Sequence, residues 1–421
     1  MKAIEHGPGG GGPEQLDALA HHAVRAELWD SALHYCREAG ARAFTRSAHR
    51  GAAAYFQQAL VALEHLPSTR ERMEQAIDLR LELRDALSPL GEYRQMFEVL
   101  GEAERLAASL GDERRHGAIT SFLCNAFTLR GDFANAIEHG ERAVRIATGL
   151  DDHTLEAVAT ALLSLAYYGA GQLRRAAEAG KRTIPLGAPA YPSPAPGTTH
   201  VQGAGKFGMV MPPAVYGRSV AAWALADLGD FAEGRCLAAE ALAIAATLDH
   251  PHSIIFASIG AGLIDLRRGE AGDALAVLEH AHAVWRTADL PAVLLEFAGP
   301  LASAYAAMGR AGEAIALLEE AVAQAIALRH GFGHVLRTGG LAEAYLAAGR
   351  IEDALPLAQL YVQVARTVSL RGTEAWALRL LADVEIHREK PDAEAAMQAL
   401  AAALVIAEEL GMRPLAARCR L

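Results

Sequence analysis

A glycine that recurs every forty residues is the feature that most constrains how this chain folds. The stretch Gly269–Ala274 (GEAGDA) is followed forty positions later by Gly309–Ala314 (GRAGEA). A glycine with a small residue five positions on recurs at Gly131 and Ala136, Gly171 and Ala176, Gly229 and Gly234, Gly349 and Ala354, and more weakly at Gly91 and Met96. Five of the six steps are forty residues, and the step from Gly171 to Gly229 adds an insertion of eighteen. A fixed period of this length with helical patterning predicts a solenoid.

Each repeat contains two amphipathic helices. After the turn at Gly309, apolar residues fall at steps of four, three and four, which places them on one helix face: Ala314, Leu318, Ala321 and Ala325. Before the turn, a second stripe ends at the glycine: Leu301, Ala302, Tyr305 and Met308. We name the helix before the turn helix A and the helix after it helix B. Forty residues hold two such helices of about 16–17 residues, each roughly 25 Å long.

Composition supports an all-α fold, an α-solenoid of stacked helix-turn-helix units with a period of about 40 residues. Hydrophobic residues make up 52% of the chain and aromatic residues only 6%, which predicts a core of Ala, Leu, Val and Ile. Alternating β-branched runs and Asn-Gly or Asp-Gly turns are missing, so no strand pattern competes. The formal net charge of −11 argues against a nucleic-acid partner, because phosphate binding relies on clustered Lys and Arg.

We expect five segments along the chain. These are a flexible leader at 1–13, a three-helix start at 14–67, a repeat array at 68–184, a Pro/Gly-rich insertion at 185–213, and a second array at 214–421 whose last repeat is incomplete. The insertion holds seven of the seventeen prolines, so it cannot be a regular helix. We expect its first half to be mobile and its second half to fold back on the solenoid through an apolar cluster, Phe207, Met209, Val210 and Met211. The insertion is either a plain linker or an element that grips a partner.

No targeting or membrane signal is visible in the sequence. Residues 1–13 lack the apolar core of a secretory signal, and no run of about 18 uncharged apolar residues could span a bilayer. We therefore expect a cytoplasmic protein with no membrane partner. The four cysteines form no Cys-x-x-Cys pair, which favours neither a zinc site nor a disulfide framework: Cys36, Cys124, Cys236 and Cys419.

No catalytic, cofactor or metal site is predicted, so we expect a protein that is not an enzyme. A phosphate-binding loop needs a glycine five residues before its second glycine and Ser or Thr after its lysine, but His200 and Phe207 occupy those positions around 203–206. His330 and His334 are four residues apart, yet glycines lie between them and the period places both in a turn between helices. No nucleophile-elbow motif is present.

Several stretches resemble a known repeat family. They are Leu19–Ala23 (LAHHA), Glu27–Ala32 (ELWDSA), Ala54–Leu60 (AYFQQAL), Glu374–Leu381 (EAWALRLL) and Glu408–Leu415 (EELGMRPL). Together they are similar to the tetratricopeptide (TPR) region that follows the ATPase module of bacterial ATPase-linked class III adenylate or guanylate cyclases, and to regulators like the maltose-regulon activator. The usual TPR unit has about 34 residues, so a period of forty implies longer helices, as in the maltose-activator type. A cyclase parent would also carry ATPase and catalytic domains, whose motifs are missing here.

The resemblance implies a binding surface. In TPR arrays the concave face, lined chiefly by helix A, binds peptides or partner domains. Carried over by register, the groove positions of this chain are Asn125, Tyr168, Trp223, Glu296, Glu343, Trp376, Arg379 and Asp383. Aromatic and arginine side chains at such positions would be natural anchors for a partner.

Two functions follow from the resemblance. The first is a non-enzymatic interaction or signal-sensing module of a bacterial regulatory system, which receives a protein, a peptide or a small-molecule signal in the concave groove. The second is the regulatory C-terminal portion of an ATPase-linked cyclase or transcriptional regulator whose catalytic or DNA-binding part is absent from this chain. An in-frame ATPase module upstream of Met1 would favour the second function.

The incomplete last repeat indicates that copies of this chain associate with each other. Residues 413–421 start a new helix A after Gly411 and stop within about two turns, which leaves Leu415 without a helix B to pack against. Leu400 and Leu404 of the preceding helix then expose part of the face on which a next repeat would stack. Because exposed apolar faces mark interaction sites, we expect contact between copies at this end.

Overall fold

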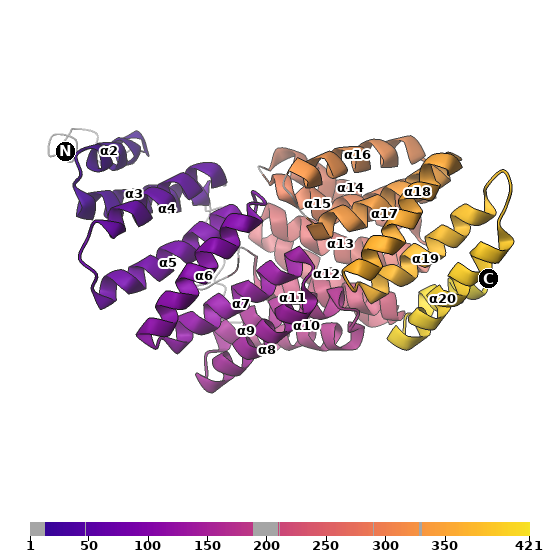
Figure 1. The fold of residues 1–421 in the computed structure, drawn as a ribbon, viewed down its shortest axis with the longest axis horizontal. Helices are drawn as coiled ribbons and strands as arrows, with labels where there is room; N and C mark the ends of the chain where they lie inside the picture. The colour runs from indigo at the N-terminus through magenta and orange to yellow at the C-terminus, as the bar shows by residue number, and fades with distance from the viewer. Residues whose placement is uncertain (1–12, 47, 188–208, 210, 289, 328–330) are drawn as a thin grey trace.

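The computed structural model describes residues 13–421 except 47, 188–208, 210, 289 and 328–330. This part of the chain is all-α, with twenty α-helices packed pairwise as TPR-like repeats, so the predicted fold class is confirmed. Figure 1 shows the helices in chain order from indigo to yellow. The predicted leader lies outside the described residues apart from Pro13, which begins the first helix.

The helices follow the predicted order of A and B. The three-helix start consists of α2 (Pro13–Arg25), α3 (Trp29–Thr45) and α4 (His49–Glu64). Helices A are α5 (Arg70–Leu87), α7 (Glu113–Arg130), α9 (His153–Gly169), α11 (Pro213–Leu228), α13 (Pro251–Arg268), α15 (Leu294–Ala307), α17 (Gly331–Ala347), α19 (Arg371–Ile386) and the short α21 (Arg413–Arg420). Helices B are α6 (Tyr93–Leu110), α8 (Phe133–Gly149), α10 (Leu173–Gly187), α12 (Phe231–Leu248), α14 (Ala271–Thr287), α16 (Ala311–Ala327), α18 (Ile351–Thr367) and α20 (Ala393–Leu410). A 3-10 helix, η2 (Pro291–Val293), precedes α15.

The recurring glycine ends helix A in the predicted way. Gly269 follows α13 with φ of 87°, a left-handed conformation that glycine adopts at little cost because it has no Cβ. The N–H of Glu270 then donates to the carbonyl oxygen of Asp265 at 2.8 Å, which satisfies one of the last carbonyls of the helix. Ala274, five positions after the glycine, is fully buried. The small residue therefore lies in the core of the repeat, as the spacing predicts.

The insertion interrupts the sequence period without separating the repeats. Helix α10 runs to Gly187, so it includes Pro185, and α11 begins at Pro213 and packs against α10. The packing is close because a Cβ on Gly180 would lie 2.4 Å from the carbonyl oxygen of Gly217. Met211 is buried against the core and Met209 packs on it, as predicted for the second half of the insertion. Phe207, Val210 and the half expected to be mobile lie outside the described residues.

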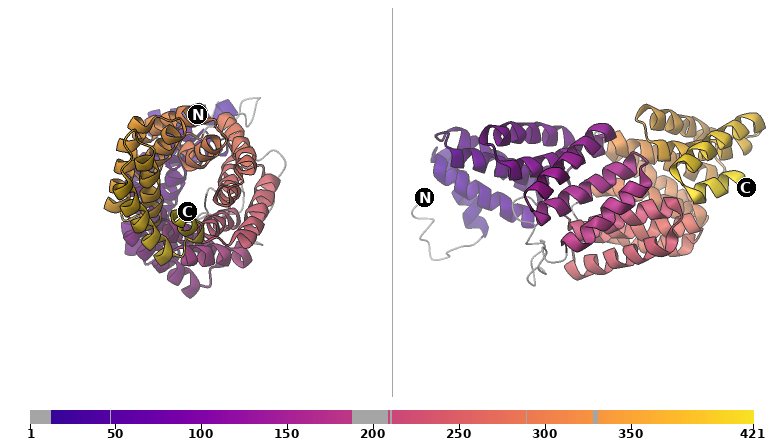
Figure 2. Two further views of the ribbon diagram at one scale, coloured as in Figure 1. Left: turned by 90° about the vertical axis from the view of Figure 1, so that its right-hand side faces the viewer. Right: turned by 90° about the horizontal axis from the view of Figure 1, so that it is seen from below.

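The repeats wind into a superhelix, which Figure 2 shows end-on. Helices A supply most of the residues that line its inner side. Repeats far apart in sequence meet where the winding closes. Helix α7 contacts α17, and the N–H of Ala292 donates to the carbonyl oxygen of Pro89 at 3.3 Å. One continuous hydrophobic core extends from Ile77 to Ala416, and a second joins α2–α4 to α5 and α6.

The C-terminal helix corrects one expectation. Leu415 does not lack a partner, because it is fully buried where α21 packs against α20, α19 and the distant α11. The guanidinium of Arg413 donates from Nε to the carbonyl oxygen of Leu228 at 2.7 Å and pairs with Asp230. The short helix thus turns inward across the winding instead of standing unpaired. Leu400 and Leu404 are half-buried against the core.

Candidate functional site

Two adjoining cavities lie on the inner side of the superhelix. The first has a volume of about 200 Å³ and the second about 390 Å³. Tyr168, Gly169, Trp223 and Glu296 line both, so the cavities meet at these residues. We call the two cavities together the lumen. Most of its wall comes from helices A, because their inward faces are the ones that the winding brings together.

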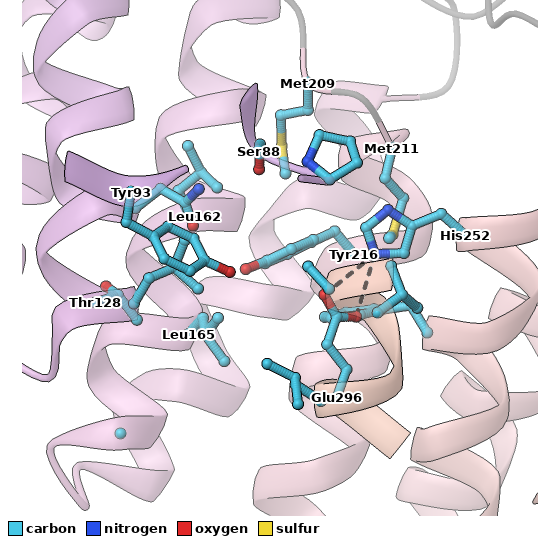
Figure 3. A pocket seen from close by; sticks show the side chains of 18 of the residues that line it. Ser88, Tyr93, Thr128, Leu162, Leu165, Met209, Met211, Tyr216, His252 and Glu296 are labelled. Carbon is cyan, nitrogen blue, oxygen red and sulfur yellow. Dashed lines mark hydrogen bonds and ion pairs between the residues drawn. The ribbon is translucent and has the colours of Figure 1, made fainter. Parts of the chain in front are cut away.

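The first cavity is walled mainly by apolar and aromatic side chains. Helices α9, α11, α13 and α15 supply Leu162, Leu165, Tyr216, Phe256 and Leu295. Figure 3 shows the hydroxyl groups of Tyr93 and Tyr216 directed toward each other across the space. The rings of Tyr216 and Phe256 stack at 4.7 Å, which fixes one wall. Such a cavity suits an apolar ligand group that a few polar atoms can orient.

A histidine and a glutamate form a polar pair beside this wall. Nε2 of His252 lies 3.1 Å from Oε2 and 3.3 Å from Oε1 of Glu296, as Figure 3 shows. Helix α13 carries His252 and α15 carries Glu296, so the pair joins two successive helices A. Nδ1 of His252 is buried with no hydrogen-bond partner among the described residues. Because Nε2 of His252 lies close to both carboxylate oxygens of Glu296, both oxygens are engaged by the ring.

Two buried arginines face the first cavity. The guanidinium carbon of Arg84 lies 3.5 Å from the ring centre of Phe122, and its Nη2 lies 2.8 Å from Oδ1 of Asp85. Arg337 is only 4% exposed, and its Nε and Nη1 have no hydrogen-bond partner among the described residues. Burial lowers the pKa of Arg337 to about 9, although Tyr93 and Glu296 act in the opposite direction. A buried cation without hydrogen-bond partners is costly.

The second cavity contains a half-buried charged network. Nε of Arg267 donates to Oδ1 of Asp227 at 2.8 Å, and the hydroxyl of Tyr168 donates to Oδ2 at 3.0 Å. The ring centre of Trp376 lies 3.9 Å from the guanidinium carbon of Arg267 and 5.7 Å from that of Arg418. Burial is the largest cause of the lowered pKa of Arg418, and Arg267 and Arg379 lower it further. The indole is thus held by arginines from α13 and α21.

The structure brings the predicted groove residues together. Seven of the eight line the lumen: Asn125, Tyr168, Trp223, Glu296, Glu343, Trp376 and Arg379. Asp383 does not line either cavity, but it pairs at 2.7 Å with Arg379, which does. Burial raises the pKa of Asp383, and Arg379 partly opposes this. Binding of a partner by these residues remains a prediction.

Sequence reasoning missed several lumen residues, among them Arg337, His252, Tyr216 and Tyr361. Tyr361 is the least expected because it belongs to a helix B, α18. It reaches the lumen across Gly339, where a Cβ would lie 2.3 Å from its ring. The pair Gly339-Gly340 inside a helix is an unusual sequence signal that could have marked this close approach.

Two further properties concern the part of the chain that the structure describes. No group of three or more His, Cys, Asp or Glu side chains there could hold a metal ion. Of the helices that are described, none is both long enough and apolar enough to cross a bilayer.

Comparison with known proteins agrees with this class of fold. The chain is an all-α protein of TPR-like repeats, and the family model described as "Tetratricopeptide repeat" matches residues 115–186. A comparison with curated proteins finds no match.

Several solved structures, two of them of Rap proteins, are similar over nearly the whole chain. A Rap protein complexed with competence and sporulation factor has a TM-score of 0.64 at 15% identity, over 90% of this chain and 98% of that one. The Rap conjugation gene regulator of plasmid pLS20, in complex with the Phr* peptide, has a TM-score of 0.57 at 12% identity, over 94% and 96%. Aspartyl phosphate phosphatase F from Bacillus subtilis has a TM-score of 0.51 at 12% identity, over 90% and 93%.

At this identity the likeness shows the fold alone. It gives no support to the cyclase or maltose-activator parent that the sequence resemblance suggested. One of the similar structures is a phosphatase by name, so the absence of enzymatic activity in this chain remains a prediction.

Proposed function

We propose that this chain is a regulator of a bacterial signalling system that binds a short peptide in its lumen. The observation that carries the proposal is a pair of buried indole N–H groups, Nε1 of Trp223 and of Trp376, that have no hydrogen-bond acceptor among the described residues. An indole N–H can only donate, and a buried donor without an acceptor costs about 1–3 kcal/mol. A peptide carbonyl oxygen would supply that acceptor.

The surroundings of the two tryptophans favour a peptide. Trp223 lies where the two cavities meet and Trp376 lies in the second, so a chain bound along the lumen would pass both. Aromatic and arginine side chains are the usual anchors for such partners. Trp376 and the Arg267 guanidinium that stacks on it place an aromatic anchor and an arginine anchor side by side.

Two similar structures support the same function. One is a complex with a competence and sporulation factor, and the other is a complex with a Phr* peptide. We extend ligand binding from these structures to this chain as a proposal. We further propose that this chain acts in the cytoplasm on a protein partner. We also propose that it does so without catalysing a reaction. The alternative, a regulatory portion of a cyclase or transcriptional regulator, gains nothing from the likeness.

Affinity selection tests the proposal. The chain is incubated with an equimolar pool of pentapeptides, and retained peptides are identified by mass spectrometry and titrated by calorimetry. Trp376→Phe keeps the ring but removes the N–H, so we expect about tenfold weaker binding, which corresponds to ~1.4 kcal/mol. Trp29→Phe is the matched control, because Trp29 stacks on His65 outside the lumen. Failure to retain any peptide, or equal binding by both variants, would contradict peptide binding at the lumen.

A further inference from the structure

We propose that the first cavity is a carboxylate-binding subsite, in which Arg337 is the counter-ion for the carboxylate of an apolar or aromatic ligand group. The inference rests on the proposed function and deepens it by naming the ligand chemistry. Arg337 is not among the eight groove residues that the sequence predicted.

Arg337 is a buried arginine without an anionic partner among the described residues. It lines the first cavity from α17, is nearly completely buried, and has two guanidinium nitrogens without hydrogen-bond partners among the described residues. No carboxylate of the described residues lies within ion-pair distance of it. A guanidinium presents its donors in a planar fork that matches the two oxygens of a carboxylate.

The acid whose charge acts on Arg337 engages another side chain. Glu296 lies beyond ion-pair distance of Arg337, and both of its oxygens contact the ring of His252. A bound carboxylate would therefore meet Arg337 without competition from an existing ion pair. The cost of burying the cation alone would be offset only when the ligand is bound.

The rest of the cavity suits an apolar body. A cavity of roughly 150 Å³ lined by apolar side chains holds a benzene ring, so about 200 Å³ leaves room for an aromatic ring with a short acid chain. Tyr216, Phe256 and Leu162 provide the apolar contacts around that ring. The same group could come from a free aromatic acid or from the C-terminal residue of a peptide.

Calorimetry with paired probes tests this subsite. The small probes are 3-phenylpropionate and the uncharged 3-phenylpropionamide. The peptide probes are a pentapeptide ending in phenylalanine with a free carboxylate and the same peptide with a C-terminal amide. We expect the wild-type chain to prefer each acid over its amide by at least about tenfold, a difference of ~1.4 kcal/mol.

Two arginine variants separate recognition from folding. Arg337→Met should abolish the preference for the acid and should leave the melting temperature without ligand unchanged or higher, because it removes an unpaired buried charge. Arg218→Met is the matched control. Arg218 is also buried, but its Nε donates to Glu240 at 2.8 Å and its Nη1 to the carbonyl oxygen of Ala214 at 3.0 Å. This variant should melt at a lower temperature and keep the preference.

The outcomes distinguish the subsite from the peptide proposal. Equal affinity for acid and amide in the wild-type chain, or an unchanged preference in Arg337→Met, would overturn the subsite while peptide binding could still stand. A marked drop in the melting temperature of ligand-free Arg337→Met would also overturn it, because Arg337 would then be part of the fold. Preferential binding of 3-phenylpropionate with no binding of either peptide would support the subsite and refute the peptide as ligand.

Discussion

Nε of Arg413 donates a hydrogen bond to the carbonyl oxygen of Leu228 at 2.7 Å, across 185 residues of chain. The contact joins the last helix to a helix A from the middle of the array, so it helps to close the winding. The neighbouring pair with Asp230 strengthens it. Since α21 also supplies Arg418 to the lumen, the end of the chain helps to shape the second cavity.

Arg413→Ala should loosen this closure. Arg413 is largely exposed, so we expect a cost of about 1 kcal/mol, equivalent to roughly fivefold faster amide exchange in α21. Hydrogen–deuterium exchange followed by mass spectrometry measures this. Arg94→Ala is the control, because Arg94 forms only an exposed pair with Glu98 on an outer helix. Unchanged exchange in α21 would show that apolar packing alone holds the helix in place.

Asp227→Ala should destabilise the chain by about 3–5 kcal/mol, because it leaves the half-buried Arg267 without its carboxylate and Tyr168 without its acceptor. Urea denaturation measures the change. Asp265→Ala, in the same helix as Arg267, is the control, since its partner Arg235 is exposed and such pairs contribute about 0–1 kcal/mol. Similar losses in both variants would contradict the special role of this pair.

Asp152→Ala should show a pH-dependent loss of stability. Burial raises the pKa of Asp152, but the N–H of Leu155 at 3.0 Å and the guanidinium of Arg114 outweigh it, so the net pKa is lowered. The folded chain therefore binds fewer protons, and the contribution is present above the unfolded pKa of about 3.9 and is lost as the pH falls through the folded pKa.

At pH 7 the loss should be about 1–2 kcal/mol, which is typical of a helix N-cap, and it should shrink below pH 4. Urea melts at pH 7 and pH 3 measure it, with the exposed Glu389→Ala as control. A loss of the same size at both pH values would mean that the charge of Asp152 is irrelevant.

Self-association at the C-terminal end stays a prediction, with its surface revised. Met397 and Val405 of α20 are 64% and 62% exposed, whereas Leu400 and Leu404 are half-buried. We expect a mass above 44.6 kDa by light scattering at micromolar concentration. Met397→Glu with Val405→Glu should reduce that mass without lowering the melting temperature, while Leu400→Glu with Leu404→Glu should destabilise the helix. A monomer at every concentration would refute self-association.

The parts of the fold that the sequence predicts are those set by local spacing. The step from Gly269 to Gly309 reports one repeat, and the helix A register places Trp223 and Trp376 on the inner side because each repeat presents the same face. The closure of the winding cannot be predicted from local spacing. It depends on a small rotation at every repeat, whose sum brings Arg413 to Leu228.

The missed site residues have a different cause. Arg337 resembles an ordinary surface residue in sequence, because arginine is seldom buried without a partner. It lies on α17, which contacts α7 although the two helices are separated by about two hundred residues. A single sequence carries no local signal for such a contact.

Filling the lumen tests the central claim most directly. Gly299 of α15 lines the second cavity, and a Cβ added there would have no neighbouring atom within 4 Å, so a larger side chain can enter the space without a clash. Gly272 of α14 is equally free but lies outside the lumen, which makes it the matched control. Calorimetric titration with the pentapeptide retained most strongly in the affinity selection compares the two variants with the wild-type chain. We predict that Gly299→Phe weakens binding by at least about tenfold, or ~1.4 kcal/mol, while Gly272→Phe binds like the wild type. Full-strength binding by a folded Gly299→Phe would contradict a ligand site in the lumen.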